Sequence, residues 1–194
     1  LMSIGNIYFR MGNYEKALQN YNSELKFYEN ISDKHAFDSV KYNVRVLLAN
    51  ISRVYIYKGN YDVALKYLIR VHKISEEVGN KSWIGQSLSD IGMIYFDKGE
   101  NEKGLEVLKE ALPIQKDTGS SEDILCVAVY LALTYKYKNL NYDIKEIDSL
   151  IQKHYNIDFK LNYRLYQLLE DISYLETAYN QIQKTADNLE PDIA

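Results

Sequence analysis

A phrase of small, aromatic and turn residues recurs along the chain, and this repetition constrains the fold more than any other feature. In the first two copies, Gly5 and Ser52 each precede an aromatic residue, a Gly-Asn turn and an alanine. Less complete copies of the phrase have their small residue at Gly92 and Ala132, so the small residues of successive copies are separated by 47, 40 and 40 residues. A fixed period of about 20 to 50 residues is typical of a solenoid, in which each unit buries its apolar face by stacking on the next.

Apolar residues within each copy recur at helical spacing. Leu48, Ile51 and Tyr55 are separated by three and four positions, which places them on one face of an amphipathic helix. A glycine inside such a helix costs about 0.5 to 1 kcal/mol relative to alanine, so the recurring small residue predicts the close approach of a second helix. The turn residues suit the left-handed position that ends a helix; they are Gly12, Gly59, Gly99 and Asn139. Each copy is therefore predicted to be a helical hairpin.

The order of these residues resembles the tetratricopeptide repeat. Both Gly5 and Ser52 are followed by Tyr after three positions, Gly four beyond that, Tyr two later and Ala three later. The resemblance covers roughly residues 1–155 and implies an all-α, right-handed superhelical solenoid of antiparallel helical hairpins. We expect an array over 1–158 with about four hairpins, the first of them truncated. The period of 40 is longer than the family's unit of about 34 residues and resembles the long units of bacterial regulatory and signalling members.

Behind the array, an apolar stripe steps by four and three residues and predicts one long helix over 159–190. The stripe consists of Leu161, Leu165, Leu168, Ile172, Leu175, Tyr179, Ile182, Ala186 and Leu189. One interpretation is a helix that caps the solenoid, as terminal units must. The other is a coiled coil over 161–189 that forms a homodimer or passes a signal onward. Because a parallel dimer would oppose Asp171 and Glu176, capping is the favoured interpretation.

The resemblance also implies where a ligand would bind, because in this family the first helix of each hairpin lines the concave surface. The corresponding groove positions are Asn6, Arg10, Asn50, Arg53, Tyr57, Gln86, Asp90, Met93, Asp97, Tyr130, Leu133 and Tyr137. Amide and aromatic groups together suit an extended or helical peptide. A solvated inner face that binds nothing is the alternative. A clamp for the C-terminal carboxylate of a chaperone is not expected, because the lysines of that subgroup are missing.

Neither a catalytic nor a metal site is expected. His35, His72 and His154 lie far apart, and none has a neighbour at a known ligand spacing. The chain has no phosphate-binding glycine loop, no G-x-S-x-G and no Cys-His signature. Cys126 falls where a small apolar residue is wanted, so we interpret it as a packing residue. The chain is therefore predicted not to be an enzyme and to need no cofactor.

Composition narrows the possible partners further. A net charge of −4 argues against nucleic acid, which usually binds a basic stripe. The longest apolar runs fall far short of the roughly 18 to 20 residues of a membrane-spanning helix. The lone cysteine fits a reducing compartment, and a cytoplasmic location is expected, although low cysteine use is also common in bacterial secreted proteins. Neither a nucleic-acid nor a membrane partner is expected.

These observations predict a scaffold module that binds a protein or peptide through its concave groove. The alternative is a sensory module of a larger regulator, such as a cyclase, a kinase or a transcription regulator. Such a module would bind a peptide or a small signal and shift the domain attached to it.

Overall fold

The computed structural model describes residues 4–31, 37–154 and 157–187, and this part of the chain contains ten helices and no strand. The helices are α1 (Ile4–Arg10), α2 (Tyr14–Glu29), α3 (Phe37–Tyr57), α4 (Tyr61–Val78), α5 (Lys81–Asp97), α6 (Asn101–Thr118), α7 (Ser121–Tyr137), α8 (Ile144–Ile151), α9 (Phe159–Leu169) and α10 (Ile172–Asp187). In the described ranges, no helix is both long and apolar enough to span a membrane.

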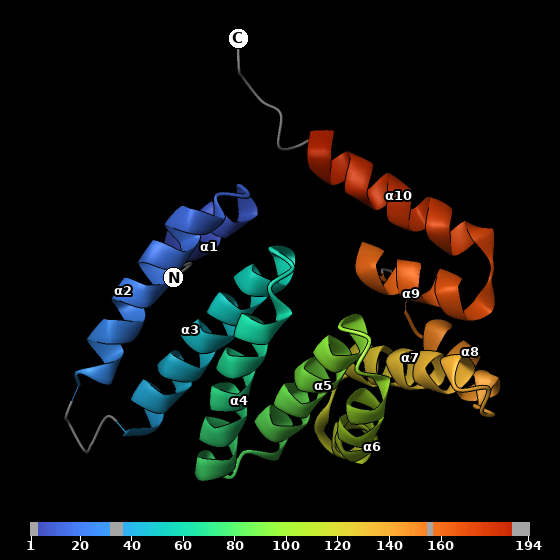
Figure 1. Ribbon diagram of the computed structural model, residues 1–194, viewed down its shortest axis with the longest axis horizontal. Helices are drawn as coiled ribbons and strands as arrows, with labels where there is room; N and C mark the ends of the chain where they lie inside the picture. The colour runs from blue at the N-terminus through green and yellow to red at the C-terminus, as the bar shows by residue number, and fades with distance from the viewer. Residues whose placement is uncertain (1–3, 32–36, 155–156, 188–194) are drawn as a thin grey trace.

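The first eight helices form four antiparallel hairpins, α1–α2, α3–α4, α5–α6 and α7–α8, which follow one another along an arc (Figure 1). The predicted all-α solenoid of helical hairpins is thereby confirmed. Its turns have the predicted geometry, since φ is +70° at Gly12 and Gly59, +79° at Gly99 and +54° at Asn139. The side chain of Asn13 or Asn60 then accepts a backbone N–H of the next helix, and so begins it one residue after the left-handed turn.

Small residues lie where the two helices of a hairpin cross. A Cβ atom added to Gly104 of α6 would lie 3.2 Å from the carbonyl oxygen of Gly92 and 3.3 Å from the amide nitrogen of Phe96, both in α5. A Cβ added to Gly92 would lie 2.7 Å from Cγ of Leu108. The two backbones therefore approach too closely for larger side chains, which explains why the repeat has glycine inside its helices.

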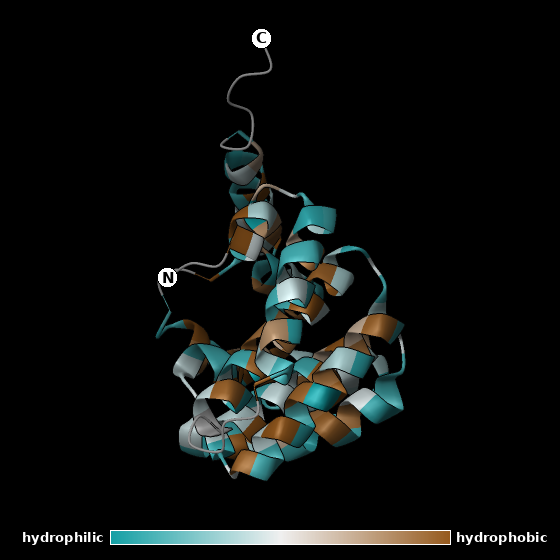
Figure 2. Ribbon diagram, turned by 90° about the vertical axis from the view of Figure 1, so that its left-hand side faces the viewer, coloured by the Kyte–Doolittle hydropathy of each residue, from teal (hydrophilic) through white to brown (hydrophobic). Residues whose placement is uncertain are grey.

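The apolar face of each helix points into a core that runs along the array. Hydrophobic and hydrophilic residues alternate within single helices (Figure 2), as amphipathic packing requires. The repeat tyrosines are partly buried and pack against these clusters; they are Tyr8, Tyr55, Tyr95 and Tyr135. Cys126 also packs against the core, and burial raises the pKa of its thiol to about 12.

A ladder of ion pairs joins successive hairpins at equivalent positions. The lysine directly before each turn residue reaches an acid in the first turn of the preceding hairpin's second helix. The pairs are Lys58–Glu15 at 2.6 Å, Lys98–Asp62 at 2.6 Å and Lys138–Glu102 at 2.8 Å. The hydrogen bond from the lysine lowers the pKa of Glu15 and of Glu102 below the usual value of a glutamate. Because the pairs are exposed, they contribute more to register than to stability.

The prediction of one long helix over 159–190 is wrong, because the structure has two helices that meet at Glu170. Glu170 adopts the left-handed conformation at φ +60° and ends α9. The amine of Lys136 donates to the carbonyl oxygens of Gln167 and Leu168, at 2.9 and 3.0 Å, and so satisfies the end of α9. The carboxylate of Asp171 accepts the backbone N–H of Ser173 where α10 begins.

A continuous coiled coil over 161–189 is therefore absent from the described part of that range. Instead, α9 packs against α7, and α10 packs back against α9 (Figure 1). Leu161, Leu165 and Leu168 are buried in the core cluster that contains α7. In α10, by contrast, Ala178 is buried while Tyr179 is 61% exposed. The apolar stripe thus changes its environment where the helix breaks.

The close crossing of α5 and α6 gives a testable prediction. Gly104→Val should lower the free energy of unfolding by about 1 to 3 kcal/mol more than Glu110→Val does, because the added methyl groups must push α5 away. Glu110 lies on the exposed side of the same helix, so this control carries the same cost of a β-branched residue in a helix. Urea denaturation of both variants measures the difference. Equal losses would show that the crossing does not limit residue size.

Candidate functional site

The α9–α10 hairpin divides the predicted groove into a covered part and an open part. The predicted groove residues lie on α1, α3, α5 and α7, the first helix of each hairpin. On α7, Tyr130 is 2% exposed and Leu133 is fully buried. The expectation that these two side chains are open to a ligand is therefore wrong. The reason is physical: α9 packs its own leucines onto this side of α7.

A single arginine of α9 anchors this packing. The Arg164 guanidinium lies 5.3 Å from the ring centres of both Phe96 and Tyr130, and its Nη2 donates to Oδ1 of Asp97. Lys160 of the same helix approaches the other carboxylate oxygen at 3.4 Å. The Asp97 side chain is 3% exposed. Asp97, a predicted ligand position, is thus occupied by an ion pair within the chain.

Two other predicted positions on this side are tied to the core. Met93 of α5 is partly buried and packs against the cluster that α7 and α9 share. Tyr137, at the end of α7, is 53% exposed and stacks on Phe96 with ring centres 5.8 Å apart. Tyr137 therefore lies at the edge of the covered region, where it remains accessible.

The open part is formed by α1 and α3, together with the near side of α5. Arg10, Arg53 and Tyr57 are exposed there, whereas Asn6 and Asn50 are half-buried. Oδ1 of Asn6 accepts a hydrogen bond from the hydroxyl of Tyr21 at 2.6 Å. The NH₂ group of Asn6 is a separate donor that this bond does not use. Of the predicted positions, these five therefore lie together on one accessible surface.

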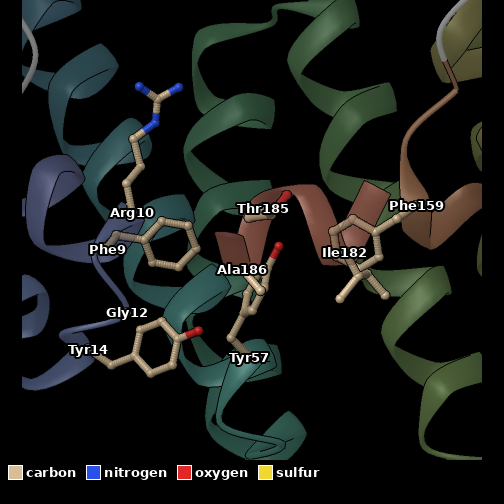
Figure 3. Close-up of a pocket in the computed structure, with 9 residues that line it drawn as sticks. All are labelled: Phe9, Arg10, Gly12, Tyr14, Tyr57, Phe159, Ile182, Thr185 and Ala186. Atoms are coloured by element: carbon tan, nitrogen blue, oxygen red, sulfur yellow. The ribbon is translucent and has the colours of Figure 1, made fainter. Parts of the chain in front are cut away.

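An apolar pocket of about 440 Å³ opens between this surface and α10 (Figure 3). Its lining consists of Phe9, Arg10, Gly12, Tyr14, Tyr57, Phe159, Ile182, Thr185 and Ala186. The Tyr57 ring lies edge-on to Phe9 at 5.2 Å and 6.2 Å from Tyr14, so the three rings form one wall. Ile182, Thr185 and Ala186 of α10 form the other wall.

Sequence reasoning found Arg10 and Tyr57 of this pocket and missed its other members. Phe9 and Phe159 carry no pattern that distinguishes a pocket wall from a core position. The walls come from opposite ends of the chain, and they meet because the second helix of the last hairpin folds back. The broken stripe was the available signal, since Asp171 is a good N-cap residue in the middle of it.

An arginine that the repeat pattern did not single out lies between α3 and α5. The Arg45 guanidinium is 4.5 Å from the Trp83 ring centre and 5.9 Å from that of Tyr42. Its Nε is buried and has no hydrogen-bond partner in the described part of the chain. Burial lowers the pKa of Arg45, and the negative charge of Asp90 opposes that shift.

The carboxyl of Asp90 is the acidic group of this region. Burial raises its pKa from 3.8 to about 6, although a hydrogen bond from Gln86 and the charges of Arg53 and Lys160 act in the opposite direction. Nε2 of Gln86 donates to Oδ1 of Asp90 at 3.2 Å. Asp90 and Gln86, both predicted groove positions, are thus partnered with each other.

No cluster of three or more His, Cys, Asp or Glu side chains suited to a metal ion occurs among the residues described.

The architecture defines a helical-repeat protein with a concave surface. A profile of the tetratricopeptide repeat matches residues 43–117, and a second profile of the same repeat matches residues 1–29. Together they cover more than half of the sequence. The chain belongs to the tetratricopeptide repeat family. No curated protein matches it.

Solved structures share this fold at low sequence identity. The apo form of RapI superposes with a TM-score of 0.74 at 16% identity, over 93% of this chain and 51% of RapI. Aspartyl phosphate phosphatase F from Bacillus subtilis gives 0.63 at 12% identity, over 96% and 47% of the two chains. A signal transduction ATPase with a tetratricopeptide repeat sensor, from Pyrococcus horikoshii, gives 0.58 at 16%, over 92% and 25%. This chain spans about half the length of RapI.

The anchoring role of Arg164 is testable by substitution. Arg164→Met should weaken the docking of α9 by about 2 to 4 kcal/mol, because it removes a cation from the rings of Phe96 and Tyr130 and leaves the buried Asp97 with Lys160 alone. Hydrogen exchange of α9 amides measures this local opening. Arg70→Met is the matched control, since Arg70 pairs with Glu29 on the surface. If exchange in α9 is unchanged, another contact holds the hairpin.

A second prediction concerns the pH dependence of stability. Because the pKa of Asp90 is raised in the folded protein, ionisation of Asp90 costs stability as pH rises from about 4 to 6. Asp90→Asn keeps the hydrogen bond from Gln86 and removes this cost. The variant should therefore be more stable than the wild type at pH 7, by about 1 to 2 kcal/mol for a half-buried carboxyl, and the two should converge near pH 4. Denaturation curves at both pH values measure it; a less stable variant at pH 7 would contradict it.

Proposed function

We propose that this chain is a peptide-binding module that holds an extended segment of a partner protein on the open part of its concave surface. One observation carries the proposal: aromatic rings of the first two hairpins face α10 across an apolar pocket of about 440 Å³. Clefts of roughly 300 to 1,000 Å³ with mainly apolar linings are typical ligand sites.

The pocket has the chemistry of an anchor site. Tyr57 is 53% exposed although it contacts two other rings, so its free face offers apolar area to a ligand. Aromatic side chains carry much of the energy at protein interfaces, because they bury large areas with few rotatable bonds. The hydroxyl groups of Tyr57 and Thr185 lie at the same pocket and can orient a polar group beside the anchor.

Amide groups beside the pocket support binding of a peptide backbone. The NH₂ of Asn6 remains available while its oxygen accepts from Tyr21. Asn50 is half-buried on α3, one turn before Arg53 and two before Tyr57. Such amides can pair with successive carbonyl and N–H groups of an extended chain. The proposed activity is binding without catalysis.

A regulatory role is the second candidate. The tetratricopeptide repeat sensor of Pyrococcus horikoshii, which is similar in fold, belongs to a signal transduction ATPase, and aspartyl phosphate phosphatase F, also similar in fold, is named as a phosphatase. In this chain, α10 supplies one wall of the pocket and is held mainly through α9. An occupied pocket would therefore stabilise the α9–α10 hairpin, and that change could pass to an attached domain.

A random-peptide display library tests the proposed function. The wild type should select peptides that the variant Tyr57→Ala with Ile182→Ala binds at least about 10-fold more weakly, because both walls of the anchor site are lost. The matched control is Phe27→Ala with Ile69→Ala, two apolar side chains that are also exposed, on α2 and α4, but lie outside the pocket. Fluorescence anisotropy with the selected peptides measures the affinities.

The result that contradicts the proposal is also defined. If no peptide is selected, or if the pocket variant and the control variant bind the selected peptides alike, the pocket is not a peptide site. Thermal unfolding of both variants checks that the four alanine substitutions leave the fold intact.

A further inference from the structure

The arginines of this chain fall into two groups according to their partners. Of the five, Arg70 pairs with Glu29 and Arg164 pairs with Asp97, both through short contacts. Arg10, Arg45 and Arg53 have no carboxylate within 4 Å in the described part of the chain. The three unpaired guanidinium groups therefore require a separate explanation.

Arg10 and Arg53 are exposed on the open part of the concave surface, and the partly buried Arg45 lies between α3 and α5. Arg10 lines the apolar pocket beside Tyr57. Arg53 lies one helical turn before Tyr57 on α3, and Arg45 lies about two turns further along the same helix. The cations thus extend from the pocket along α3.

Arg45 is held in place before any ligand arrives. Its guanidinium stacks on Trp83 at 4.5 Å, and its Nε is buried. Stacking on an aromatic ring orders the long side chain and leaves its terminal NH₂ groups as donors for a ligand. A planar guanidinium fixed in this way matches the two oxygens of a carboxylate.

Three arginines occur in this region although the chain as a whole carries −4. Asp90 is the acid whose charge acts on both Arg45 and Arg53, and it is hydrogen-bonded to Gln86 rather than to either arginine. Asp97 is already paired with Arg164 and Lys160. A cationic strip on an acidic protein attracts anionic ligands to that strip.

Building on the proposed function, we propose that the groove selects an acidic peptide, in which an apolar side chain enters the pocket and carboxylates pair with Arg53 and Arg45. The spacing along α3 sets the pattern. From Tyr57, Arg53 is roughly 6 Å and Arg45 roughly 18 Å away at 1.5 Å per residue. An extended peptide advances about 3.3 Å per residue, so the acids fall about two and about five positions from the apolar residue.

Nucleic acid fits the same strip less well. Recognition of a phosphate backbone uses many cations in a stripe, because every nucleotide carries a charge. Here three arginines share the surface with Asp90, and the apolar pocket at one end suits a side chain. A nucleic acid would therefore leave most of its phosphates and the apolar pocket unpaired, whereas an acidic peptide with one apolar side chain can use both the arginines and the pocket.

Peptides selected from the random library provide the test. Aspartate and glutamate should be enriched at the two predicted positions relative to the apolar residue. Replacing both acids by their amides should weaken binding to the wild type at least about 10-fold at low salt, and less at high salt. Arg45→Met with Arg53→Gln should remove this preference, and the methionine keeps the contact with Trp83. Arg70→Gln is the control and should keep the full preference.

The outcomes separate the two proposals. If peptides bind through Tyr57 but show no preference for acids, the proposed function stands and the acidic selection fails. If no peptide binds, both fail. If an oligouridylate displaces a labelled selected peptide at a lower concentration than the same unlabelled peptide does, the three arginines bind nucleic acid and the inference is overturned. Retention of the acid preference in the Arg45 and Arg53 variant also overturns it.

Discussion

The close crossing of two helices within each hairpin is the contact on which the rest of this structure depends. At Gly92 and Gly104 the backbones approach so closely that even a methyl group meets main-chain atoms. This proximity fixes the angle of each hairpin and leaves one helix of every pair on the inner side of the arc. A row of inward-facing positions follows, and any ligand that the chain binds on its concave surface must meet side chains from that row.

The concave surface is shared between the protein's own last hairpin and the space left for a ligand. Helix α9 takes the part formed by α7 and the far end of α5, where Arg164 inserts between aromatic rings and pairs with Asp97. The part near α1 and α3 stays open, and α10 closes it into a pocket. The same hairpin therefore removes one half of the groove and completes the other.

The repeat could be predicted from sequence because its characteristic residues act on nearby parts of the chain. Gly59, Asn60 and Ala64 act on neighbours within a few residues, and each of the three does what its position in the repeat predicts. The groove could be predicted only in part. Whether Tyr130 faces solvent depends on a helix that lies 34 residues away in sequence, and no periodicity encodes that. The continuous stripe behind the array concealed a helix break, because both helices of a hairpin turn apolar residues to a shared core.

The ladder of lysines and acids has a consequence for how such an array can change in length. Lys98 and Asp62 pair with each other, and both lie within one 40-residue unit, between the partners Lys58–Glu15 on one side and Lys138–Glu102 on the other. Removing residues 60–99 would delete both members of that pair and orphan no charge in the remaining two. Duplicating the same segment would add a complete pair. Unequal recombination between copies could therefore lengthen or shorten the array without leaving an unmatched lysine or acid in this ladder.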